Sequence, residues 1–434
     1  MRVTIIGTGY VGLVSGACLS DFGHIVTCVD KDAAKITQLG KGAMPLFEGG
    51  LEELVQRNVQ AARLFFTNEL APAVRSADIV MIAVGTPSRR GDGFADVSFV
   101  MDAAREVARE LQPQTIVVTK STVPVGTGDQ VEDEIAKLRG VRDIEVVSNP
   151  EFLREGAAIE DFKRPDRIVV GTEDARARAV MRELYRPLFI NETPILFTGR
   201  RTAELIKYAS NAYLATKVTF INEIANLCEA AGANVQDVAR GMGLDRRIGS
   251  KFLHAGPGFG GSCLPKDVAA LAATATQHGV RMQIVESVMA VNTSRRAAMV
   301  DRIVAACGGS VQGKALAVLG LTFKPNTDDM REAPSLAILP ALTEQGASVR
   351  AYDPAGMEEA RKFIPGLATA PDPYTCMQDA EALVILTEWD QFRALDLDRV
   401  KAALRTPVIV DLRNIYKPAD MSAKGFSYVS IGRP

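Results

Sequence analysis

The first 195 residues alternate between short apolar runs and longer amphipathic stretches. Apolar runs bounded by turn residues predict buried strands, and the stretches between them have the period of helices that cover a sheet. Strands and helices that alternate in this way form a parallel sheet with crossover helices. We therefore expect an α/β domain over residues 1–198, with strands at 3–7, 25–30, 79–84, 116–120, 144–148 and 168–171.

The pattern changes to an uninterrupted helical run between residues 202 and 234. At about 1.5 Å per residue, such a helix is roughly 45 Å long. Further helical segments follow at 235–241, 266–278 and 282–306, so we expect a central helical domain over residues 199–308. A helix of this length has apolar residues to cover on more than one side, which favours a dimer surface.

The alternation of strands and helices returns after Gly313. Apolar runs at 315–321, 348–352, 382–386, 408–411 and 428–431 predict a second α/β domain over residues 309–434. A chain of 434 residues with 47% hydrophobic residues is long enough for two or three domains. The predicted fold class is therefore α/β, with two Rossmann-like parallel-sheet lobes joined by a long helix and an α-helical middle domain.

The charge balance narrows the class of partner. Fifty lysines and arginines stand against 52 aspartates and glutamates, which offers no basic footprint for nucleic acid or an anionic membrane and favours a small molecule. The first residues lack the charged head and apolar run of a signal peptide, and no segment of about 18 apolar residues spans a membrane. We expect a soluble, cytoplasmic protein. Six scattered cysteines without a C-x-x-C pair, and only three histidines, suggest neither a disulfide framework nor a metal site.

A glycine-rich segment follows the first predicted strand. Gly7, Gly9 and Gly12 have the spacing of a dinucleotide fingerprint, and a helical stretch begins at Val11. In such a fingerprint the glycines allow a tight turn, close approach to a pyrophosphate and packing of the helix against the strand. The bare pattern also occurs in ordinary turns, but its place between a strand and a helix favours nucleotide binding.

The ends of the following strands add polar side chains near the same crevice. Asp30 lies eighteen residues beyond Gly12, where a carboxylate binds an adenosine ribose and repels a 2′-phosphate, so we expect NAD rather than NADP. Lys35 either helps to hold the ribose or phosphate or is a solvated helix lysine. Thr86 and Thr122 follow two further strands, although small hydroxyl residues there are also common in turns.

One cysteine differs from the other five in its neighbours. Cys263 lies in GFGGSCLPKD, behind glycines that let the backbone wrap closely around a bulky group. Pro265 suits the first turn of a helix, so Cys263 lies just before a helix N-terminus, where the amides and Lys266 favour the thiolate. In a nicotinamide enzyme such a cysteine can hold an aldehyde as a thiohemiacetal, which loses a hydride to give a thioester and then an acid. A buried, inert cysteine is the alternative.

This chemistry also needs an oxyanion partner and a base. Lys207 and Asn211 lie four residues apart in the long predicted helix, hence on one face. Glu151 and Glu155 follow a predicted strand in NPEFLREG, and either is a candidate base. Taken alone, a helix lysine is usually solvated and paired glutamates usually lie at the surface.

Six motifs carry a resemblance to a known family over essentially the whole chain: GTGYVG, KSTVPVGT, NPEFLREG, AELIKYASNAYLATK, GFGGSCLPKD and GLTFKPNTDDMRE. In order and spacing they resemble the UDP-glucose 6-dehydrogenases, within the larger family of nucleotide-sugar dehydrogenases. The resemblance implies two Rossmann-like lobes joined by a long dimerising helix. It also implies a four-electron oxidation at C6 of the sugar, in which UDP-glucose, water and two NAD give UDP-glucuronate and two NADH.

The resemblance assigns roles to matching positions. The catalytic positions are Cys263 as nucleophile, Lys207 and Asn211 at the oxyanion, Asp267 in proton transfer with Lys207 and an ordered water, Glu155 and Thr122 at the water that hydrolyses the thioester, and Glu151 as a further acidic position. The cofactor positions are Gly7, Gly9, Tyr10, Val11, Gly12, Asp30, Lys35, Thr86, Thr122, Glu155, Lys266 and Arg331. The substrate positions are Glu151, Phe152, Leu153, Arg154, Lys207, Asn211, Arg247, Phe252, Leu253, Phe259, Gly260, Lys324 and Arg413.

The resemblance further implies assembly and leaves some alternatives open. Arg247 matches an arginine that reaches the substrate of the partner subunit, so we expect a homodimer or a higher even-numbered homo-oligomer. His254 stands where relatives often carry lysine or asparagine, and it either contacts a substrate hydroxyl or packs.

Three other functions compete with UDP-glucose oxidation. GDP-mannose or UDP-N-acetylmannosamine is the alternative substrate for the same mechanism, although RRIGSKFLHAGPG and GAAIEDFKRPDRIVVG look more like the UDP-glucose branch. A sensor that binds nucleotides without turnover is disfavoured by the presence of Cys263, Lys207 and Asp267 together. A structural module leaves both ligand-type motifs unexplained.

Overall fold

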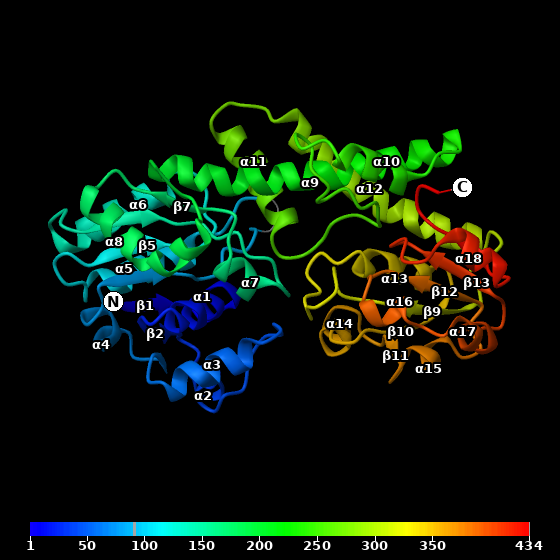
Figure 1. The fold of residues 1–434 in the computed structure, drawn as a ribbon, viewed down its shortest axis with the longest axis horizontal. Coiled ribbons are helices and arrows are strands. Elements are labelled where there is room, and N and C mark those ends of the chain that lie inside the picture. Colours follow the sequence, from blue (N-terminus) through cyan, green and yellow to red (C-terminus); the bar gives the residue numbers. More distant parts are fainter. Residues whose placement is uncertain (90–92, 434) are drawn as a thin grey trace. The chain divides into compact units, whose positions relative to one another are not determined.

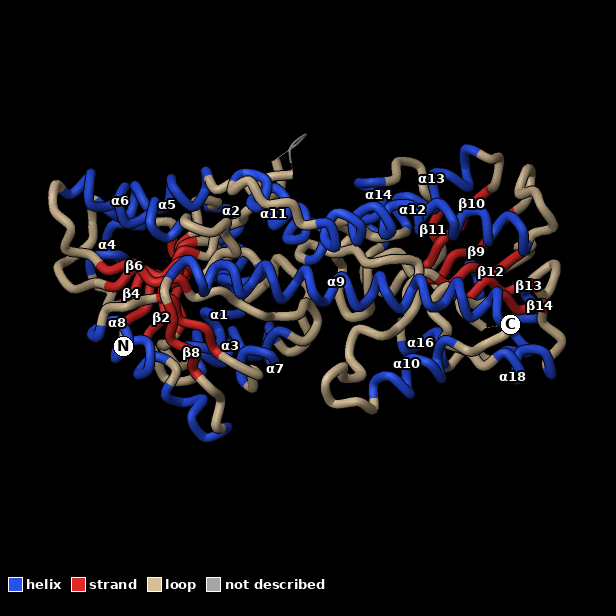
Figure 2. The backbone as a smooth tube through the Cα atoms, turned by 90° about the horizontal axis from the view of Figure 1, so that it is seen from above, coloured by secondary structure: helices blue, strands red, loops and turns tan. Residues whose placement is uncertain are grey.

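The computed structural model describes residues 1–89 and 93–433, which fold into two compact units (Figure 1). Unit 1 consists of residues 1–210 with 273–280, and unit 2 of residues 211–272 with 281–434. Each unit contains one sheet with helices on both faces, as the strands and helices in Figure 2 show. The predicted α/β class with two sheets and a helical middle region is confirmed.

The sheet of unit 1 has eight strands in the order β3-β2-β1-β4-β5-β6-β7-β8. All six predicted strands are present, and two short strands that the sequence analysis missed, β3 and β8, form its edges. Neighbouring strands are parallel except at β6 and β7, which pair antiparallel at Ser148 and Gly171, so the expected all-parallel sheet is wrong at this point. The strands are β1 (Arg2–Ile6), β2 (Ile25–Val29), β3 (Leu64–Thr67), β4 (Ile79–Ile82), β5 (Ile116–Thr119), β6 (Glu145–Ser148), β7 (Ile168–Gly171) and β8 (Ile195–Thr198).

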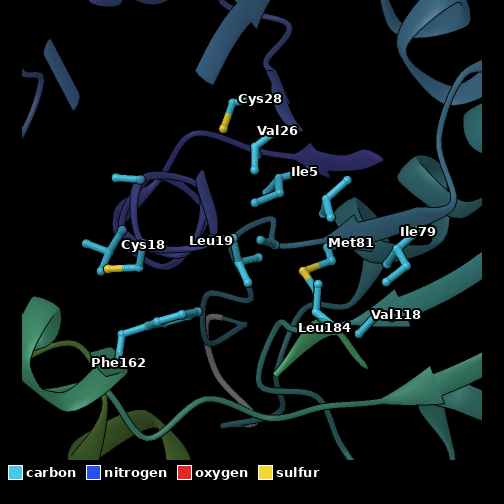
Figure 3. Packing of buried hydrophobic residues seen from close by; sticks show 14 of the residues in the cluster. Ile5, Cys18, Leu19, Val26, Cys28, Ile79, Met81, Val118, Phe162 and Leu184 are labelled. Carbon is cyan, nitrogen blue, oxygen red and sulfur yellow. The ribbon is translucent and has the colours of Figure 1, made fainter. Parts of the chain in front are cut away.

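Two apolar cores form on the two faces of this sheet because successive strand residues point to opposite sides. One core takes Val3 and Ile5 from β1, and the other takes Ile6. Figure 3 shows Leu19 of helix α1 pointing toward Ile5 and Met81 of the sheet in the first of these cores, while Cys18 lies on the side of the helix toward Phe162. The helices of unit 1 are α1 (Tyr10–Asp21), α2 (Ala33–Gly40), α3 (Leu51–Gln60), α4 (Leu70–Arg75), α5 (Ser98–Ala108), α6 (Thr127–Arg139), α7 (Ala158–Lys163), α8 (Ala175–Leu184) and the 3-10 helix η1 (Arg186–Asn191).

The helical middle region begins with a single helix of 32 residues, α9 (Arg200–Ala231). It begins two residues earlier and ends three residues earlier than predicted. The helix passes from unit 1 to unit 2 between Ser210 and Asn211. The three helices that follow were also predicted, with small shifts at their ends. They are α10 (Val235–Gly243), α11 (Leu264–Gln277) and α12 (Gln283–Ala306).

The sheet of unit 2 has six parallel strands in the order β11-β10-β9-β12-β13-β14. The five predicted strands are present, and the edge strand β11 was missed. The strands are β9 (Ala315–Leu319), β10 (Ser348–Tyr352), β11 (Ala368–Thr369), β12 (Ala382–Ile385), β13 (Val408–Asp411) and β14 (Ser427–Val429). The helices are α13 (Ser335–Glu344), α14 (Met357–Phe363), α15 (Pro373–Met377), α16 (Asp390–Arg393), α17 (Leu397–Ala403) and α18 (Pro418–Ala423).

The second half of α9 belongs to a core of unit 2. Ile221 and Ala225 of this helix are fully buried and lie in one cluster with Val318 of β9 and Ile303 of α12. The division into domains at 198/199 and 308/309 remains a prediction beside the two compact units. Among the described residues, none of the helices combines the length and the apolarity that crossing a bilayer requires.

Candidate active site

The glycine loop of unit 1 has the geometry of a nucleotide-binding turn. Gly7 has a φ of +101° and its amide donates to Val29 O at 2.8 Å, while a Cβ on Gly12 would lie 2.0 Å from Gly7 O. Both positions therefore require glycine for the fold itself. Gly9 precedes the first residue of α1, and a Cβ there would meet nothing within 4 Å. Open space at Gly9 and the first-turn amides of α1, which have no partner within a helix, fit a pyrophosphate, which is bound at such helix ends.

Asp30 lies directly after β2 and is hydrogen bonded to the glycine loop. Its Oδ2 accepts from the amide and the hydroxyl of Thr8 at 2.8 and 2.6 Å, and Lys35 Nζ lies 3.4 Å from the same oxygen. Oδ1 accepts from the amide of Asp32 at 3.1 Å. Burial raises the pKa of Asp30, but these hydrogen bonds and Lys35 outweigh it and hold the pKa below its ordinary value. The group is thus an ionised acceptor at the place expected for the ribose.

Tyr10, at the start of α1, connects the glycine loop to the segment 149–156. Its hydroxyl contacts the carboxylate of Glu48 and accepts from Gly156 N at 3.0 Å. Glu48 also accepts from the amides of Gly156 and Ala158 at 2.6 and 2.8 Å. Sequence reasoning missed Glu48, a carboxylate that is only 8% exposed, because its partners lie far from it in the sequence. Val11, the next residue of α1, packs against the core of the sheet.

The two predicted threonines at strand ends lie together. Thr86 Oγ1 donates to the carbonyl oxygen of Thr122 at 2.8 Å, and both residues are more than nine-tenths buried. Thr122 and Lys207 also line one small cavity of about 10 Å³. The cavity is lined by Thr119, Ser121, Thr122, Val123, Ser148, Pro150, Glu204 and Lys207.

Glu151 and Lys207 form a buried ion pair. Lys207 Nζ lies 3.1 Å from Glu151 Oε1, and the side chains are only 4% and 5% exposed. Burial raises the pKa of Glu151, but the Lys207 ammonium and the amide of Leu153 outweigh it and hold the pKa below its usual range. Lys207 also lies 5.3 Å from the ring centroid of Phe152, and Arg167 stacks on that ring at 3.6 Å. The alternative of solvated surface residues is therefore wrong for both Glu151 and Lys207.

The rest of the segment 149–156 divides into a buried and an exposed part. Glu155 is 9% exposed. The pKa of Tyr10 is raised by burial and by Glu48, and Glu155 adds a smaller effect of the same sign. Arg154 pairs with Asp161, with Nη2 2.5 Å from Oδ1, and its side chain is 59% exposed. Leu153 is half-buried against the core of unit 1.

Cys263 in unit 2 lies immediately before the first residue of α11, as predicted. Its carbonyl oxygen accepts from Asp267 N at 3.0 Å, the first hydrogen bond of the helix, and its Sγ is 3.4 Å from the hydroxyl of Ser262. Cys263 is half-buried, whereas the other five cysteines are buried. Its position beside the helix N-terminus favours the thiolate.

One turn into α11, Asp267 is completely buried between two predicted site residues. Asn211 Nδ2 donates to its Oδ2 at 2.6 Å, and Lys266 Nζ lies 2.6 Å from its Oδ1. Asn211 is 7% exposed and comes from α9. Both carboxylate oxygens of Asp267 therefore have a partner. The Asn211 side chain is held in one orientation, in which it can make a second contact.

The glycine segment before Cys263 packs against the protein itself. A Cβ on Gly260 would lie 2.2 Å from Glu332 O, and Gly261 donates its amide to Arg331 O at 2.9 Å. Two residues that sequence reasoning missed hold the segment from α12. Asn292 exchanges hydrogen bonds of 2.9 and 3.1 Å with the backbone of Phe259, and Arg295 donates to Gly256 O at 2.6 Å. The glycines therefore serve at least in part to bring backbone segments together.

The remaining predicted substrate residues of unit 2 differ in exposure. Leu253 and Phe259 are buried, Phe252 is half-buried with a φ of +63°, and His254 is exposed. Arg413 is largely buried, and its Nε donates to Leu386 O at 2.7 Å and lies 3.2 Å from Glu388 Oε2.

Three basic residues of the predicted site lie nearer the surface. Lys324 Nζ lies 5.3 Å from the ring centroid of Phe323, and Arg331 pairs with Asp329 at 2.8 Å. The side chain of Arg247 is 89% exposed and pairs with Asp245 at 2.6 Å. Its Nε also lies 3.0 and 3.2 Å from the two Asp245 oxygens, so these contacts of Arg247 stay within its own turn.

Within each unit the structure thus gathers part of the predicted site. Unit 1 brings Thr86 to Thr122 and Glu151 to Lys207, while unit 2 brings Asn211, Lys266 and Asp267 to the turn that follows Cys263. No group of three or more metal-binding side chains occurs among the residues that the structure describes.

Known proteins resemble this chain over its full length. The UDP-glucose/GDP-mannose dehydrogenase family matches in three parts, its NAD binding domain at residues 1–189, its central domain at 201–294 and its UDP binding domain at 317–418. The UDP-glucose 6-dehydrogenase of Rhizobium meliloti (strain 1021) is 62% identical over 436 residues, covering 100% of both chains. The UDP-glucose 6-dehydrogenase TuaD of Bacillus subtilis (strain 168) is 46% identical, over 100% of this chain and 93% of its own. A UDP-glucose dehydrogenase structure from Pyrobaculum islandicum is 37% identical, with a TM-score of 0.90 over 99% of this chain and 96% of its own.

Proposed function

Because the chain belongs to the UDP-glucose/GDP-mannose dehydrogenase family, we propose that it is an NAD-dependent UDP-glucose 6-dehydrogenase. The reaction converts UDP-glucose, one water and two NAD to UDP-glucuronate and two NADH. The observation that carries the proposal is Cys263 at the start of α11, with the carboxylate of Asp267 one turn further held by Asn211 and Lys266. A protein that only senses nucleotides has no use for this arrangement.

The glycine loop and the residues around it hold the cofactor. The amides of the first turn of α1, from Tyr10 and Val11, face the pyrophosphate across the open space at Gly9. Asp30 and Lys35 take the adenosine ribose, and the ionised carboxylate of Asp30 disfavours a 2′-phosphate. NAD, when bound, supplies an acceptor for the hydride that leaves C6 at each oxidation. The further residues proposed to contact it are Gly7, Gly12, Thr86, Thr122, Glu155, Lys266 and Arg331.

Cys263 carries the second oxidation. After the alcohol has become an aldehyde, the thiolate adds to C6, which forms a sulfur–carbon bond and an oxyanion. Loss of hydride re-forms the carbonyl as a thioester. Water then adds to the thioester, the sulfur–carbon bond breaks, and the acid leaves with Cys263 again a thiolate.

Cationic and amide groups on α9 stabilise the oxyanion. Lys207 and Asn211 lie four residues apart in this unbroken helix and therefore on one face. Lys207 is held by Glu151 at 3.1 Å, and Asn211 by Asp267 at 2.6 Å, so both are oriented before substrate arrives. Preorganised donors of this kind stabilise developing charge more effectively than water does.

Two carboxylates serve the proton transfers. Asp267 is the proposed partner of Lys207 and an ordered water when the alcohol loses its proton. Glu155 and Thr122 are the proposed positions for the water that hydrolyses the thioester. Both residues are at least nine-tenths buried, which limits competing reactions with bulk water.

The substrate contacts follow from charge and shape. Lys324 and Arg413 are the proposed partners of the UDP phosphates or sugar, because ammonium and guanidinium groups suit phosphate recognition. The other proposed substrate residues are Glu151, Phe152, Leu153, Arg154, Lys207, Asn211, Arg247, Phe252, Leu253, Phe259 and Gly260.

We also propose a homodimer, or a higher even-numbered homo-oligomer, in the cytoplasm. Tyr213, Phe220 and Leu227 recur every seven residues along α9, and 62%, 45% and 62% of each side chain is exposed in the single chain. Such an apolar stripe is typical of a helix that packs against a partner. Arg247, 89% exposed, is then available to the substrate of the partner subunit. All six cysteines are free, as is usual in a reducing compartment.

Sedimentation equilibrium tests the assembly. The variant Y213E/L227E is expected to sediment as a monomer, while Leu138→Glu, at an exposed position of α6, keeps the wild-type mass. A monomeric wild type overturns the proposal.

The stoichiometry of NADH tests the function itself. Two NADH per UDP-glucose consumed, with little or none from GDP-mannose or UDP-N-acetylmannosamine, is the expected result. One NADH per sugar contradicts the thioester step. A preference for another nucleotide sugar keeps the proposed mechanism but contradicts UDP-glucose as the substrate.

A further inference from the structure

Unit 1 contains a second buried lysine that has no role in the proposed reaction so far. Lys120 follows the last residue of β5 and is 4% exposed. Burying a charged side chain is costly unless the fold compensates it. The described chain provides no carboxylate at ion-pair distance from its ammonium group, so its contacts require another explanation.

The contacts of Lys120 join it to the end of the neighbouring strand. Its Nζ donates to Asn149 Oδ1 at 3.2 Å and to Asn149 O at 3.4 Å, and it lies 3.5 Å from the hydroxyl of Tyr185. Tyr185 in turn donates to Asn149 Oδ1 at 2.6 Å, and Asn149 Nδ2 donates to Val169 O at 2.7 Å. The Phe162 ring centroid lies 6.0 Å from Nζ. Lys120 is therefore held by uncharged groups around Asn149.

Asn149 leads directly into the Glu151 and Lys207 pair. Only Pro150, whose ring fixes φ, separates Asn149 from Glu151. A side chain that fixes both oxygens of Asn149 thus fixes the start of the segment that carries Glu151. The Glu151 and Lys207 charges are 3.1 Å apart and shielded from water, so a third charge nearby acts on both with little screening.

The charged groups that act on Lys120 are this same pair. Burial lowers the pKa of Lys120 to about 8, Glu151 opposes that change, and Lys207 adds to it. Tyr185, the other titratable group in contact, is neutral because burial raises its pKa. The charge of Lys120 therefore depends on Glu151 and Lys207.

We propose that Lys120 is a positioning residue, which holds Asn149 and sets the ionisation of the Glu151 and Lys207 pair through its own charge. This inference rests on the proposed oxidation, in which Lys207 stabilises the oxyanion. Loss of the Lys120 charge removes attraction for the Glu151 carboxylate and repulsion from the Lys207 ammonium. The pKa values of both groups rise as a result.

The test is the pH profile of NADH formation with saturating UDP-glucose and NAD. Lys120→Gln keeps a polar contact to Asn149 but removes the charge, and we expect its kcat profile to move to higher pH by about half a unit or more. Lys120→Met is expected to show the same displacement and a lower maximal rate, because it also loses the hydrogen bonds. Tyr185→Phe removes a hydroxyl from the same cluster without changing charge, so its profile keeps the wild-type position.

The outcomes separate the possible roles. A Lys120→Gln enzyme whose pH profile matches the wild type overturns the role of the Lys120 charge. If Tyr185→Phe and Lys120→Met lose the same rate and neither pH profile moves, Lys120 only supports the structure. Thermal unfolding and NAD binding establish that each variant is folded. If Lys120→Met does not fold, the pH profile of Lys120→Gln still tests the proposal. If the wild type forms no NADH from any nucleotide sugar, the proposed function fails rather than this inference.

Discussion

Asn211 donates from Nδ2 to Oδ2 of Asp267 at 2.6 Å, and the acceptor is completely buried. The second oxygen of Asp267 lies 2.6 Å from Lys266 Nζ, so the carboxylate is bound at both ends one turn after Cys263. A carboxylate without solvent is stable only with such partners. The pair therefore fixes the side-chain amide of Asn211, on α9, relative to the N-terminal turn of α11 within unit 2.

Replacing Cys263 by serine is expected to abolish the formation of acid. An alkoxide forms far less readily than a thiolate at neutral pH, so the second oxidation should slow by at least about a thousand-fold. NADH formed per UDP-glucose and binding of NAD by calorimetry are the two measurements, and the binding should be unchanged. Cys307→Ser, outside the proposed site, is the matched control and should keep full turnover. Unchanged turnover in Cys263→Ser contradicts the cysteine mechanism.

Asp267→Asn keeps the size of the side chain and removes its charge. We expect kcat to fall by about a hundred-fold to ten-thousand-fold, the range for loss of a proton-transfer group, with NAD affinity retained. Single-turnover absorbance at the wavelength of NADH measures the chemical step directly. Asp237→Asn, on the surface of α10, should leave kcat unchanged. A kcat for Asp267→Asn near that of the wild type would mean that Asp267 only supports the fold.

Asp30→Asn is expected to weaken NAD binding by about ten-fold to a hundred-fold, because hydrogen bonds to a charged group contribute this much to binding. Isothermal titration measures this change, and Asp32→Asn, which keeps its cap on α2, should bind NAD within about two-fold of the wild type. Equal affinities in Asp30→Asn and the wild type would remove the ribose assignment.

The same carboxylate predicts a pH dependence of stability. The pKa of Asp30 in the folded chain lies below its ordinary value, because its hydrogen bonds outweigh burial. Its contribution to stability is therefore fully present above the unfolded pKa of about 4 and is lost as the pH falls through the lower folded value. Thermal unfolding should show that the difference in Tm between the wild type and Asp30→Asn narrows over that acidic range. A difference that widens there contradicts the sign.

Gly260→Ala tests the close packing before Cys263. Its Cβ would meet Glu332 O at 2.2 Å, so we expect a loss of about 1–3 kcal/mol in the free energy of unfolding and reduced turnover. Gly241→Ala is the matched control, because Gly241 lies inside α10 with nothing within 4 Å of the added Cβ. That substitution should stabilise the chain by up to about 1 kcal/mol. Urea unfolding measures both, and equal effects would show that the contact with Glu332 relaxes easily.

The amino-acid pattern was enough to predict most elements and to suggest the chemistry. Central strands such as β4 and β12 are continuous apolar runs, because both faces of the sheet are covered, and local pattern is enough to find them. The glycine loop and Cys263 were also recognisable, since each depends on a few neighbouring residues. The edge strands β3 and β8 were missed because most of their side chains are partly exposed, although they are as long as the predicted strands β4–β7.

The side chains that hold the site in place became apparent from the packing of distant elements. Asn211 and Asp267 are 56 residues apart, and Glu48 reaches Ala158 across 110 residues. Lys120 looked like the end of a strand, and its contacts with Asn149 became visible only when β5 and β6 were paired. The period of apolar residues indicates which face of one helix or strand is buried, whereas these contacts depend on which elements become neighbours. That choice is made by the packing of the whole chain, which no local pattern records.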